Sequence, residues 1–312
     1  MQDEVKIFTG NGNPALAQAI CDHLGIPLGK AGIIRFSNEN IFVQIQENVR
    51  ERDVFVVQPL SSPVSENLVE LLIMMDALRS ASARRITAVI PYYSYARSDR
   101  KDKPRISIAG RLIADLLVTA GANRILTMTL HSEQVQGFFQ CQADHLSATP
   151  ILCEYFEKLA LANCVAFAAD AGSARRAGAY AIRLDIPLAF ADKRRVSDTR
   201  VEIRSIVGDV TGKTVLYFDD EIAHGSSLLE TVKVLKTMGV GDIYVGATHG
   251  VFTGDAVERI AASPIKQVIV TDTVPLPPEK RADKIVQLSV APLFGEAIRR
   301  IHTGESISAI FE

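Results

Sequence analysis

Short runs in which successive residues are apolar recur along the whole chain, and they constrain its fold more than any other feature. Strands buried on both faces of a sheet have such runs, whereas strands with one wet face alternate apolar and polar residues. Amphipathic segments with helical spacing lie between the runs. This alternation predicts an α/β fold with mainly parallel sheets flanked by helices. The runs are Val5–Phe8, Ile33–Phe36, Val54–Gln58, Ile86–Tyr92, Ile125–Leu130, Val165–Ala169, Leu188–Ala191, Thr214–Phe218, Ile243–Thr248, Gln267–Thr271 and Ile285–Val290.

The domain organisation follows from the length and from one break in the pattern. A chain of 312 residues suits two domains of ordinary size. The alternation of strands and helices is interrupted at Cys141–Pro150, which we interpret as the crossing between the halves, so the domains are expected at residues 1–146 and 147–303. Arg200–Val207 alternates apolar and polar residues, and this predicts an antiparallel strand added to the second sheet.

Composition excludes several classes of partner. The net charge of −2 gives no general attraction to nucleic acid or to an anionic membrane, so we expect neither as a partner. No apolar run is long enough to cross a membrane, and residues 1–10 contain no basic stretch followed by an apolar one, so no secretory signal is predicted. Scattered cysteines without a CxxC pair are typical of a reducing compartment, and the predicted location is cytoplasmic. The cysteines are Cys21, Cys141, Cys153 and Cys164.

Two glycine-rich segments look like nucleotide-binding motifs but lack the context that such motifs need. Gly10–Ala15 follows a predicted strand and opens a helix, yet no acid stands about 20 residues further on to bind ribose hydroxyls. Gly208–Thr214 is one residue short of a P-loop and precedes a strand, whereas a P-loop follows one. We therefore expect no nicotinamide site at the first segment and a simple turn at the second.

The sharpest local signal is a strand that ends in two carboxylates and is followed by a loop of small residues. Asp219 and Asp220 end the run that starts at Thr214, and Ala223–Ser227 precedes a helix. Amides and hydroxyls at a helix N-terminus bind an anion, and ligands of parallel sheets lie outside the carboxyl ends of the strands. Carboxylates beside such an anion site can bind sugar hydroxyls or a divalent cation. A sugar phosphate would therefore suit the site, with its phosphate at the loop and its hydroxyls at the carboxylates. An acidic, solvent-exposed turn with a serine helix cap is the alternative that this segment alone leaves open.

Further segments narrow the interpretation, because they resemble the motifs of the ribose-phosphate pyrophosphokinase family in the family's order, from about residue 8 to the end. The resemblance implies two tandem phosphoribosyltransferase-type domains, with the tail at 304–312 packing back on the first. The segments are Phe36–Asn40, Glu47–Arg50, Pro91–Lys101, Leu130–Phe139, Asp192–Arg195, Ala247–Gly250, Val270–Thr273 and Glu305–Ser308.

The resemblance also implies an activity and the residues that carry it. The expected reaction moves the β,γ-diphosphoryl group of ATP to the anomeric hydroxyl of ribose 5-phosphate, with Mg²⁺ as cofactor, in a homohexamer built from dimers. It places ribose 5-phosphate on Asp219, Asp220, Ala223, His224, Gly225, Ser226 and Ser227, ATP on Phe36, Asn38, Glu39, Asn40, Arg97 and Ser98, a metal ion on His131 and Asp170, and catalysis on Lys193 and Arg195.

Several positions depart from the family's usual residues. Thr129 stands where an aspartate is usual, Ser173 replaces a glycine, and the phosphate loop reads Ala-His-Gly-Ser-Ser instead of Asp-Thr-x-Gly-Thr. Weaker metal binding would follow from the change at Thr129. Two alternatives therefore stay open: a catalytically silent regulatory paralogue of the same family, and a phosphoribosyltransferase or phosphoribosyl-sensing regulator.

Overall fold

The structure is a computed structural model that describes residues 5–195 and 201–310, without the side chains of residues 193–204 and 309. The chain divides into two compact units. The first contains the residues up to Ser147, the short segment Thr273–Pro275 and the residues from Ser289 on. The second contains Ala148–Asp272 and Leu276–Leu288.

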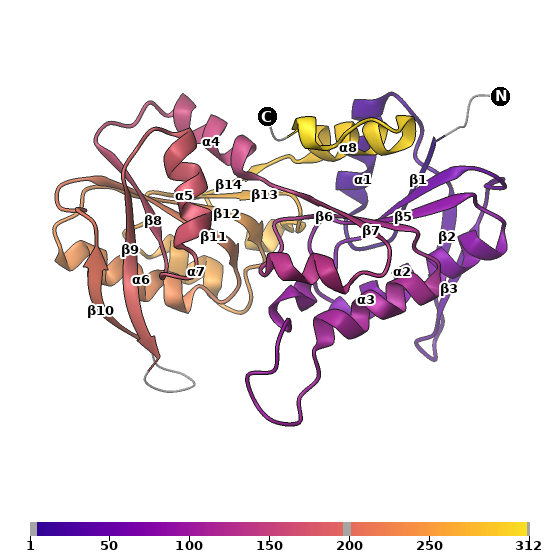
Figure 1. Ribbon diagram of the computed structural model, residues 1–312, viewed down its shortest axis with the longest axis horizontal. Helices are drawn as coiled ribbons and strands as arrows, with labels where there is room; N and C mark the ends of the chain where they lie inside the picture. Colours follow the sequence, from indigo (N-terminus) through magenta and orange to yellow (C-terminus); the bar gives the residue numbers. More distant parts are fainter. Residues whose placement is uncertain (1–4, 196–200, 311–312) are drawn as a thin grey trace. The chain divides into compact units, whose positions relative to one another are not determined.

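The described residues of the first unit form a parallel sheet of five strands in the order β1-β4-β5-β6-β7. Helices α1 and α8 cover one face of this sheet, and α2 and α3 cover the other (Figure 1). Every residue of β4 is buried, as its continuous apolar run predicts. The elements are β1 (Val5–Thr9), α1 (Pro14–Leu24), β4 (Asp53–Val57), α2 (Val64–Ser80), β5 (Arg85–Ile90), η1 (Ser94–Arg97), α3 (Ala109–Ala120), β6 (Arg124–Met128), η2 (Glu133–Phe138), β7 (Gln142–Leu146), α8 (Ala291–Thr303) and η4 (Ser308–Ile310).

A two-stranded antiparallel hairpin lies outside the parallel sheet of the first unit. It consists of β2 (Ala31–Arg35) and β3 (Ile41–Ile45), so the run predicted at Ile33–Phe36 is not a strand of the main sheet. One face of the hairpin packs on the core through Ile33 and Val43, while Ile34 on the other face is exposed. Only one face is buried because the hairpin covers α2 from outside instead of lying between two helix layers.

The chain passes from the first unit to the second between Ser147 and Ala148, within the segment Cys141–Pro150 that was expected as the crossing. That segment also contains β7, which was not predicted; its polar residues are tolerated because β7 is an edge strand of the sheet. Residues 289–303, expected in the second domain, belong to the first unit because α8 packs along α1. The sequence pattern did not reveal that α8 returns to the first unit, because α8 is far from α1 along the chain.

The described residues of the second unit form a seven-stranded sheet in the order β10-β9-β8-β11-β12-β13-β14. Its strands are parallel except for β10, which pairs antiparallel with β9 and confirms the predicted antiparallel extension. Helices α4 and α5 cover one face, and α6 and α7 cover the other (Figure 1). The elements are α4 (Thr149–Lys158), β8 (Cys164–Ala168), α5 (Ala174–Arg183), β9 (Leu188–Arg195), β10 (Val201–Val207), β11 (Thr214–Ile222), α6 (Ser226–Thr237), β12 (Ile243–Gly250), α7 (Ala256–Ala261), β13 (Gln267–Thr271), η3 (Pro278–Lys280) and β14 (Ile285–Leu288).

Strand β11 shows why the apolar runs are continuous. Tyr217 stacks on Phe167 with ring centroids 5.9 Å apart, and its neighbour Phe218 stacks on Tyr180 at 3.9 Å on the opposite face. Successive side chains of a strand point to opposite faces, so a strand between two helix layers needs an apolar residue at each position. The predicted α/β fold class is confirmed.

The cysteines are free thiols, in agreement with the sequence prediction. Burial raises the pKa of Cys21 to about 11 and that of Cys153 to about 12, so both remain protonated and unreactive at neutral pH. None of the helices in the described parts of the chain has the length and apolar character needed to span a membrane.

Candidate active site

Two adjacent carboxylates near the carboxyl end of β11 form the centre of the second unit's candidate site. The Asp220 carboxylate is buried and accepts a bond of 2.6 Å from Nη1 of Arg176, on the first turn of α5. The Asp219 carboxylate accepts from the Asp220 amide at 2.9 Å. Burial, and then the charge of Asp220, raise the pKa of Asp219 well above its usual range. The Asp220 carboxylate is therefore stabilised by the Arg176 cation, whereas a proton or a bound cation would stabilise the Asp219 carboxyl group.

The small-residue loop Ala223–Ser227 follows β11 and opens α6. Gly225 is the N-cap residue and adopts φ 75°, a left-handed conformation that costs glycine little. The first amides of an α-helix have no partner within the helix, so they point out of its N-terminus. The Oγ atom of Ser226, the first helical residue, lies 2.9 Å from Nδ1 of His224. A helix N-terminus of this kind can bind an anion, and binding of a phosphate here stays a prediction.

Asp170 follows β8, the strand that pairs with β11, so the two strand ends lie on the same edge of the sheet. Ser173 anchors its carboxylate: the Ser173 amide donates to Oδ1 of Asp170 at 2.8 Å. The hydroxyl of Ser173 also lies 3.1 Å from the Asp170 amide and from Oδ1. The serine hydroxyl, which glycine lacks, thus adds contacts that hold the metal-site candidate Asp170 in place.

His131 is exposed and follows β6 in the first unit. The backbone before it is held from β7, because Nε2 of His145 accepts from the Leu130 amide at 2.8 Å. Thr129, two residues before His131, adopts φ 42°. Such a left-handed conformation is strained for a β-branched residue. The departure from aspartate therefore removes a carboxylate and also leaves strain in the chain beside His131.

The predicted ATP residues lie in two segments of the first unit. Phe36, Asn38, Glu39 and Asn40 form the turn between β2 and β3, where Phe36 is 49% exposed and lies 6.0 Å from Phe42, ring centroid to ring centroid. Such an exposed aromatic ring can stack on a base. Arg97 and Ser98 end η1, beyond the carboxyl end of β5, which pairs with β6. Arg97 and His131 therefore follow neighbouring strands of one sheet.

The backbone at Ser98 is held close to α3. The Gly110 amide donates to the Ser98 carbonyl at 3.0 Å, and the Tyr93 hydroxyl donates to the Gly110 carbonyl at 2.8 Å. A Cβ atom at Gly110 would approach the Tyr95 carbonyl oxygen to 2.9 Å, so only glycine permits this contact. Tyr92 and Tyr93 are buried, which agrees with a core role for part of this tyrosine-rich segment.

The catalytic candidates Lys193 and Arg195 lie on β9, where their backbones pair with Ile203 and Val201 of β10. Their side chains lie outside the described part of the structure. Their catalytic role stays a prediction.

The glycine-rich segment Gly10–Ala15 is occupied by the protein itself. The Asn11 amide donates to the Glu70 carboxylate at 2.5 Å, and the Gly12 amide donates to Oε1 of Gln58 at 2.8 Å. A Cβ atom at Gly10 would lie 2.4 Å from the Glu70 carboxylate. Because buried side chains already bind these amides, the geometry supports the prediction that no nicotinamide site is present here.

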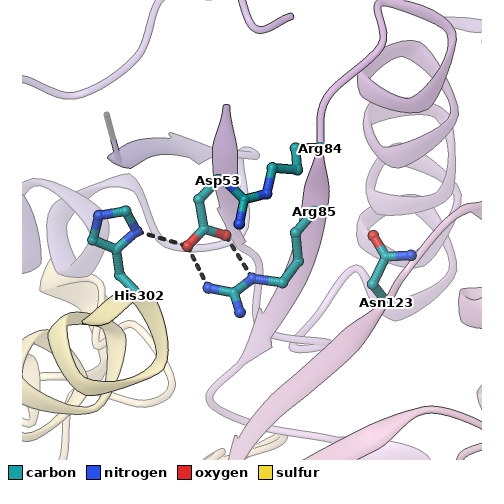
Figure 2. A pocket seen from close by; sticks show the side chains of 5 residues that line it. All are labelled: Asp53, Arg84, Arg85, Asn123 and His302. Carbon is teal, nitrogen blue, oxygen red and sulfur yellow. Dashed lines mark hydrogen bonds and ion pairs between the residues drawn. The ribbon is translucent and has the colours of Figure 1, made fainter. Parts of the chain in front are cut away.

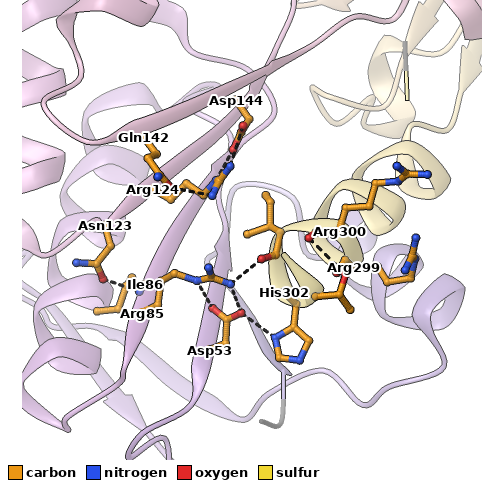
Figure 3. Close-up of polar contacts among 12 residues, drawn as sticks. Asp53, Arg85, Ile86, Asn123, Arg124, Gln142, Asp144, Arg299, Arg300 and His302 are labelled. Carbon is orange, nitrogen blue, oxygen red and sulfur yellow. Dashed lines mark hydrogen bonds and ion pairs between the residues drawn. The ribbon is translucent and has the colours of Figure 1, made fainter. Parts of the chain in front are cut away.

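A cavity of about 320 Å³ lies at the amino ends of β4 and β5 (Figure 2). Asp53 lies at its centre, between Nε of Arg85 at 2.8 Å and Nδ1 of His302 at 2.8 Å. Figure 3 shows Asp53 between Arg85 and His302. Arg85 also donates to the Ile301 carbonyl at 3.0 Å. Arg84 and Asn123 complete the lining. Since ligands of parallel sheets bind at the opposite, carboxyl ends, we interpret this cluster as a clamp that ties α8 to the sheet.

The described part of the chain does not present a complete set of metal ligands. Among residues 5–195 and 201–310, no group of three or more His, Cys, Asp or Glu side chains is placed to hold a metal ion. Mg²⁺ characteristically uses one or two carboxylates together with substrate phosphates, so its sites often lack a full protein ligand set.

Comparison with known proteins decides the family. A family model described as the N-terminal domain of ribose phosphate pyrophosphokinase matches residues 5–121, and one described as the phosphoribosyl synthetase-associated domain matches residues 196–312. The ribose-phosphate pyrophosphokinase of Deinococcus radiodurans is 55% identical over 310 residues, which cover 98% of this chain and 97% of that protein. The chain belongs to the ribose-phosphate pyrophosphokinase family.

Other members of the ribose-phosphate pyrophosphokinase family agree over the full length. The enzyme of Bacillus caldolyticus is 46% identical, over 100% of this chain and 99% of that protein. The crystal structure of phosphoribosylpyrophosphate synthetase from Mycobacterium smegmatis matches with a TM-score of 0.91 at 38% identity, covering 96% of this chain and 99% of that one. The predictions of this enzyme family and of two tandem phosphoribosyltransferase-type domains are confirmed.

The structure of this ribose-phosphate pyrophosphokinase family member adds residues that sequence reasoning missed. Arg176 binds Asp220, and Arg259 of α7 reaches Ser226 in the loop 223–227. The position of Arg176 on the helix after Asp170 was a usable signal, because that helix starts at the same sheet edge as the site. Arg259 had no such signal, because it lies 33 residues beyond Ser226.

Proposed function

We propose that this enzyme transfers the β,γ-diphosphoryl group of ATP to the anomeric hydroxyl of ribose 5-phosphate, giving phosphoribosyl diphosphate and AMP. The observation that carries the proposal is the end of β11, where Asp219 and Asp220 precede a glycine-capped helix N-terminus within one strand-loop-helix unit. The loop suits the 5-phosphate and the carboxylates suit the ribose hydroxyls. The full-length match to the family supports this reaction over a phosphoribosyltransferase.

The reaction is one in-line displacement. The oxygen of the anomeric hydroxyl forms a bond to the β-phosphorus and loses its proton. The bond between the β-phosphorus and the oxygen that bridges it to the α-phosphorus breaks, and AMP leaves with that oxygen. Such transfers need little covalent help, so the protein acts mainly by positioning the reactants and by neutralising charge.

Each domain supplies part of this positioning. In the first, exposed Phe36 packs on adenine, Asn38, Glu39 and Asn40 adjoin the nucleotide, and Arg97 with Ser98 binds its phosphates. In the second, Lys193 and Arg195 stabilise the migrating oxygens, Lys as a compact charge and Arg as a planar fork. Asp219, Asp220 and the loop 223–227 hold the acceptor sugar phosphate.

Mg²⁺ fits the oxygen donors that the structure presents. Asp170, anchored through Ser173, is the carboxylate that would hold it, and the imidazole of His131 suits a contact through water because Mg²⁺ prefers oxygen ligands. When bound, the ion neutralises charge on the diphosphate oxygens. We also propose that the enzyme is cytoplasmic, in keeping with its free thiols, and assembles as a homohexamer built from dimers. Sedimentation equilibrium tests the assembly.

The decisive assay measures Mg²⁺-dependent AMP formation from ATP and ribose 5-phosphate by the purified protein alone. We expect turnover in the parent and a loss of roughly 100-fold or more in Lys193→Ala, as for other deletions of charge stabilisation in a transition state. Absence of AMP from an intact, folded parent would refute the proposal and favour the silent regulatory paralogue. Release of pyrophosphate from phosphoribosyl diphosphate and a nucleobase would favour the phosphoribosyltransferase.

A further inference from the structure

Arg259 reaches the phosphate loop from α7, a different element of the second unit. Its guanidinium lies 3.3 Å (Nη1) and 3.4 Å (Nη2) from Oγ of Ser226. It also lies 2.7 Å from Nδ1 of His224 and donates to the His224 carbonyl at 3.3 Å. The guanidinium therefore sits against the first residue of α6, on the loop that opens the helix.

The directions of these hydrogen bonds define the state of His224. A guanidinium has donors and no acceptor, so Nδ1 of His224 must accept from Arg259. The ring is then neutral, with its proton on Nε2, which lies 3.7 Å from the Asp255 carboxylate. The Ser226 hydroxyl oxygen, 2.9 Å from Nδ1, also accepts from Arg259. His224 thus acts as an acceptor that orients Arg259 and is not itself a cation of the loop.

The loop itself contributes no side chain with a permanent positive charge. Residues 223–227 contain neither lysine nor arginine, so amides and hydroxyls are the donors that the loop itself supplies. Asp255 lies 3.6 Å from Nη1 of Arg259 and neutralises part of its charge, but the Arg259 side chain remains 32% exposed. A planar guanidinium forms paired, charge-assisted hydrogen bonds with phosphate oxygens. A sugar without a phosphate has no such anionic oxygens.

We propose that Arg259 is a ligand of the 5-phosphate and selects a pentose phosphate monoester over the free pentose, while His224 holds the guanidinium in place. The inference rests on the proposed function, because that function places the phosphate at this loop. It predicts that Arg259 governs affinity for the acceptor substrate and leaves the nucleotide site unchanged, because Phe36, Arg97 and the other proposed ATP residues belong to the first unit.

The test compares Arg259→Gln with the parent in steady-state kinetics and in calorimetric titration with ribose 5-phosphate. We expect KM and Kd for ribose 5-phosphate to rise roughly 10- to 100-fold, as for loss of a charge-assisted hydrogen bond, with KM for ATP within about 2-fold. Arg259→Lys, which keeps the charge and loses the fork, should give an intermediate rise. Lys233→Gln is the matched control, because it removes one positive charge from an exposed site about two turns further along α6.

Two substitutions of His224 test the orienting role. His224→Asn keeps a side-chain acceptor near the position of Nδ1 and should retain most of the affinity for ribose 5-phosphate. His224→Leu removes the acceptor and should raise KM for ribose 5-phosphate in the same direction as Arg259→Gln, by a smaller factor. Equal effects of the two substitutions would overturn the role assigned to His224.

The outcomes separate this inference from the proposed function. A folded Arg259→Gln variant whose Kd for ribose 5-phosphate stays within about 2-fold of the parent would overturn the role of Arg259, even with the reaction intact. A parent that binds ribose 5-phosphate without turnover would refute the proposed function, and the two Kd values would still decide the role of Arg259. A parent that binds no ribose 5-phosphate would overturn both. Thermal unfolding of each variant shows whether weaker binding reflects loss of the fold.

Discussion

The ion pair between Arg176 and Asp220 gives the most direct test of the energetics of the site. The Asp220 side chain is 4% exposed and the Arg176 side chain 25%, with 2.6 Å between Nη1 and Oδ1. Arg176→Met leaves the carboxylate buried next to Asp219 without its cation, which costs about 3–5 kcal/mol. Asp220→Asn costs less, about 1–2 kcal/mol, because the arginine left behind can reach water.

The measurement is thermal and urea unfolding at neutral pH, followed by far-ultraviolet circular dichroism because the chain has no tryptophan. Arg176→Met should lower the Tm of the transition that includes the second unit by roughly 10 °C. The double variant Arg176→Met/Asp220→Asn should recover most of that loss, because both members of the pair are then neutral. Additive effects in the double variant, or a Tm for Arg176→Met no lower than that of Asp220→Asn, would refute the reasoning.

Three further predictions follow from individual contacts. Because burial, and then the charge of Asp220, raise the pKa of Asp219, its carboxylate destabilises the fold increasingly as pH rises from about 4 through the folded-state pKa. Asp219→Asn should therefore raise Tm at pH 8, lose that advantage below about pH 4, and impair turnover; a pH-independent difference in Tm would contradict this. Replacing strained Thr129 by Asn should stabilise the protein by about 1 kcal/mol, and Thr129→Asp should in addition lower the Mg²⁺ concentration for half-maximal rate; an unchanged Mg²⁺ dependence would exclude a metal at this strand end. Asp53→Asn should loosen the clamp on α8 and lower the free energy of local unfolding of this helix by about 1–3 kcal/mol. Hydrogen exchange of the α8 amides should then accelerate by roughly 10-fold or more, while that of the α6 amides stays unchanged. Unchanged exchange in α8 would show that its packing on α1 is sufficient to hold it.

Much of the second unit's site was readable from sequence because its signals are local. The run from Thr214, the carboxylates Asp219 and Asp220, and the loop 223–227 are contiguous, so a strand, its end and the following helix could be predicted together. These predictions needed no knowledge of which distant segments meet. Asp170 was expected at the site only from the family resemblance, and the structure shows that it lies on the same sheet edge, one strand away.

The first unit was predicted less well, because the positions of its strands depend on contacts between segments far apart in the sequence. The hairpin of β2 and β3 contains short apolar runs that resemble buried strands, and only its packing on α2 shows that one face is wet. Polar residues hid β7, because an edge strand can tolerate them. Fold class therefore followed from the sequence, while the membership of individual strands did not.

By itself the sequence determined the alternation of strands and helices, the parallel sheets, and the strand ends at which chemistry gathers, because these depend on side-chain periodicity over a few residues. Only the tertiary structure decided which partners hold those groups. Arg176 lies 44 residues from Asp220, Arg259 lies 33 from Ser226, and His302 lies 249 from Asp53. Such contacts depend on how complete elements pack, and the pattern within one segment carries no record of the element that will lie beside it.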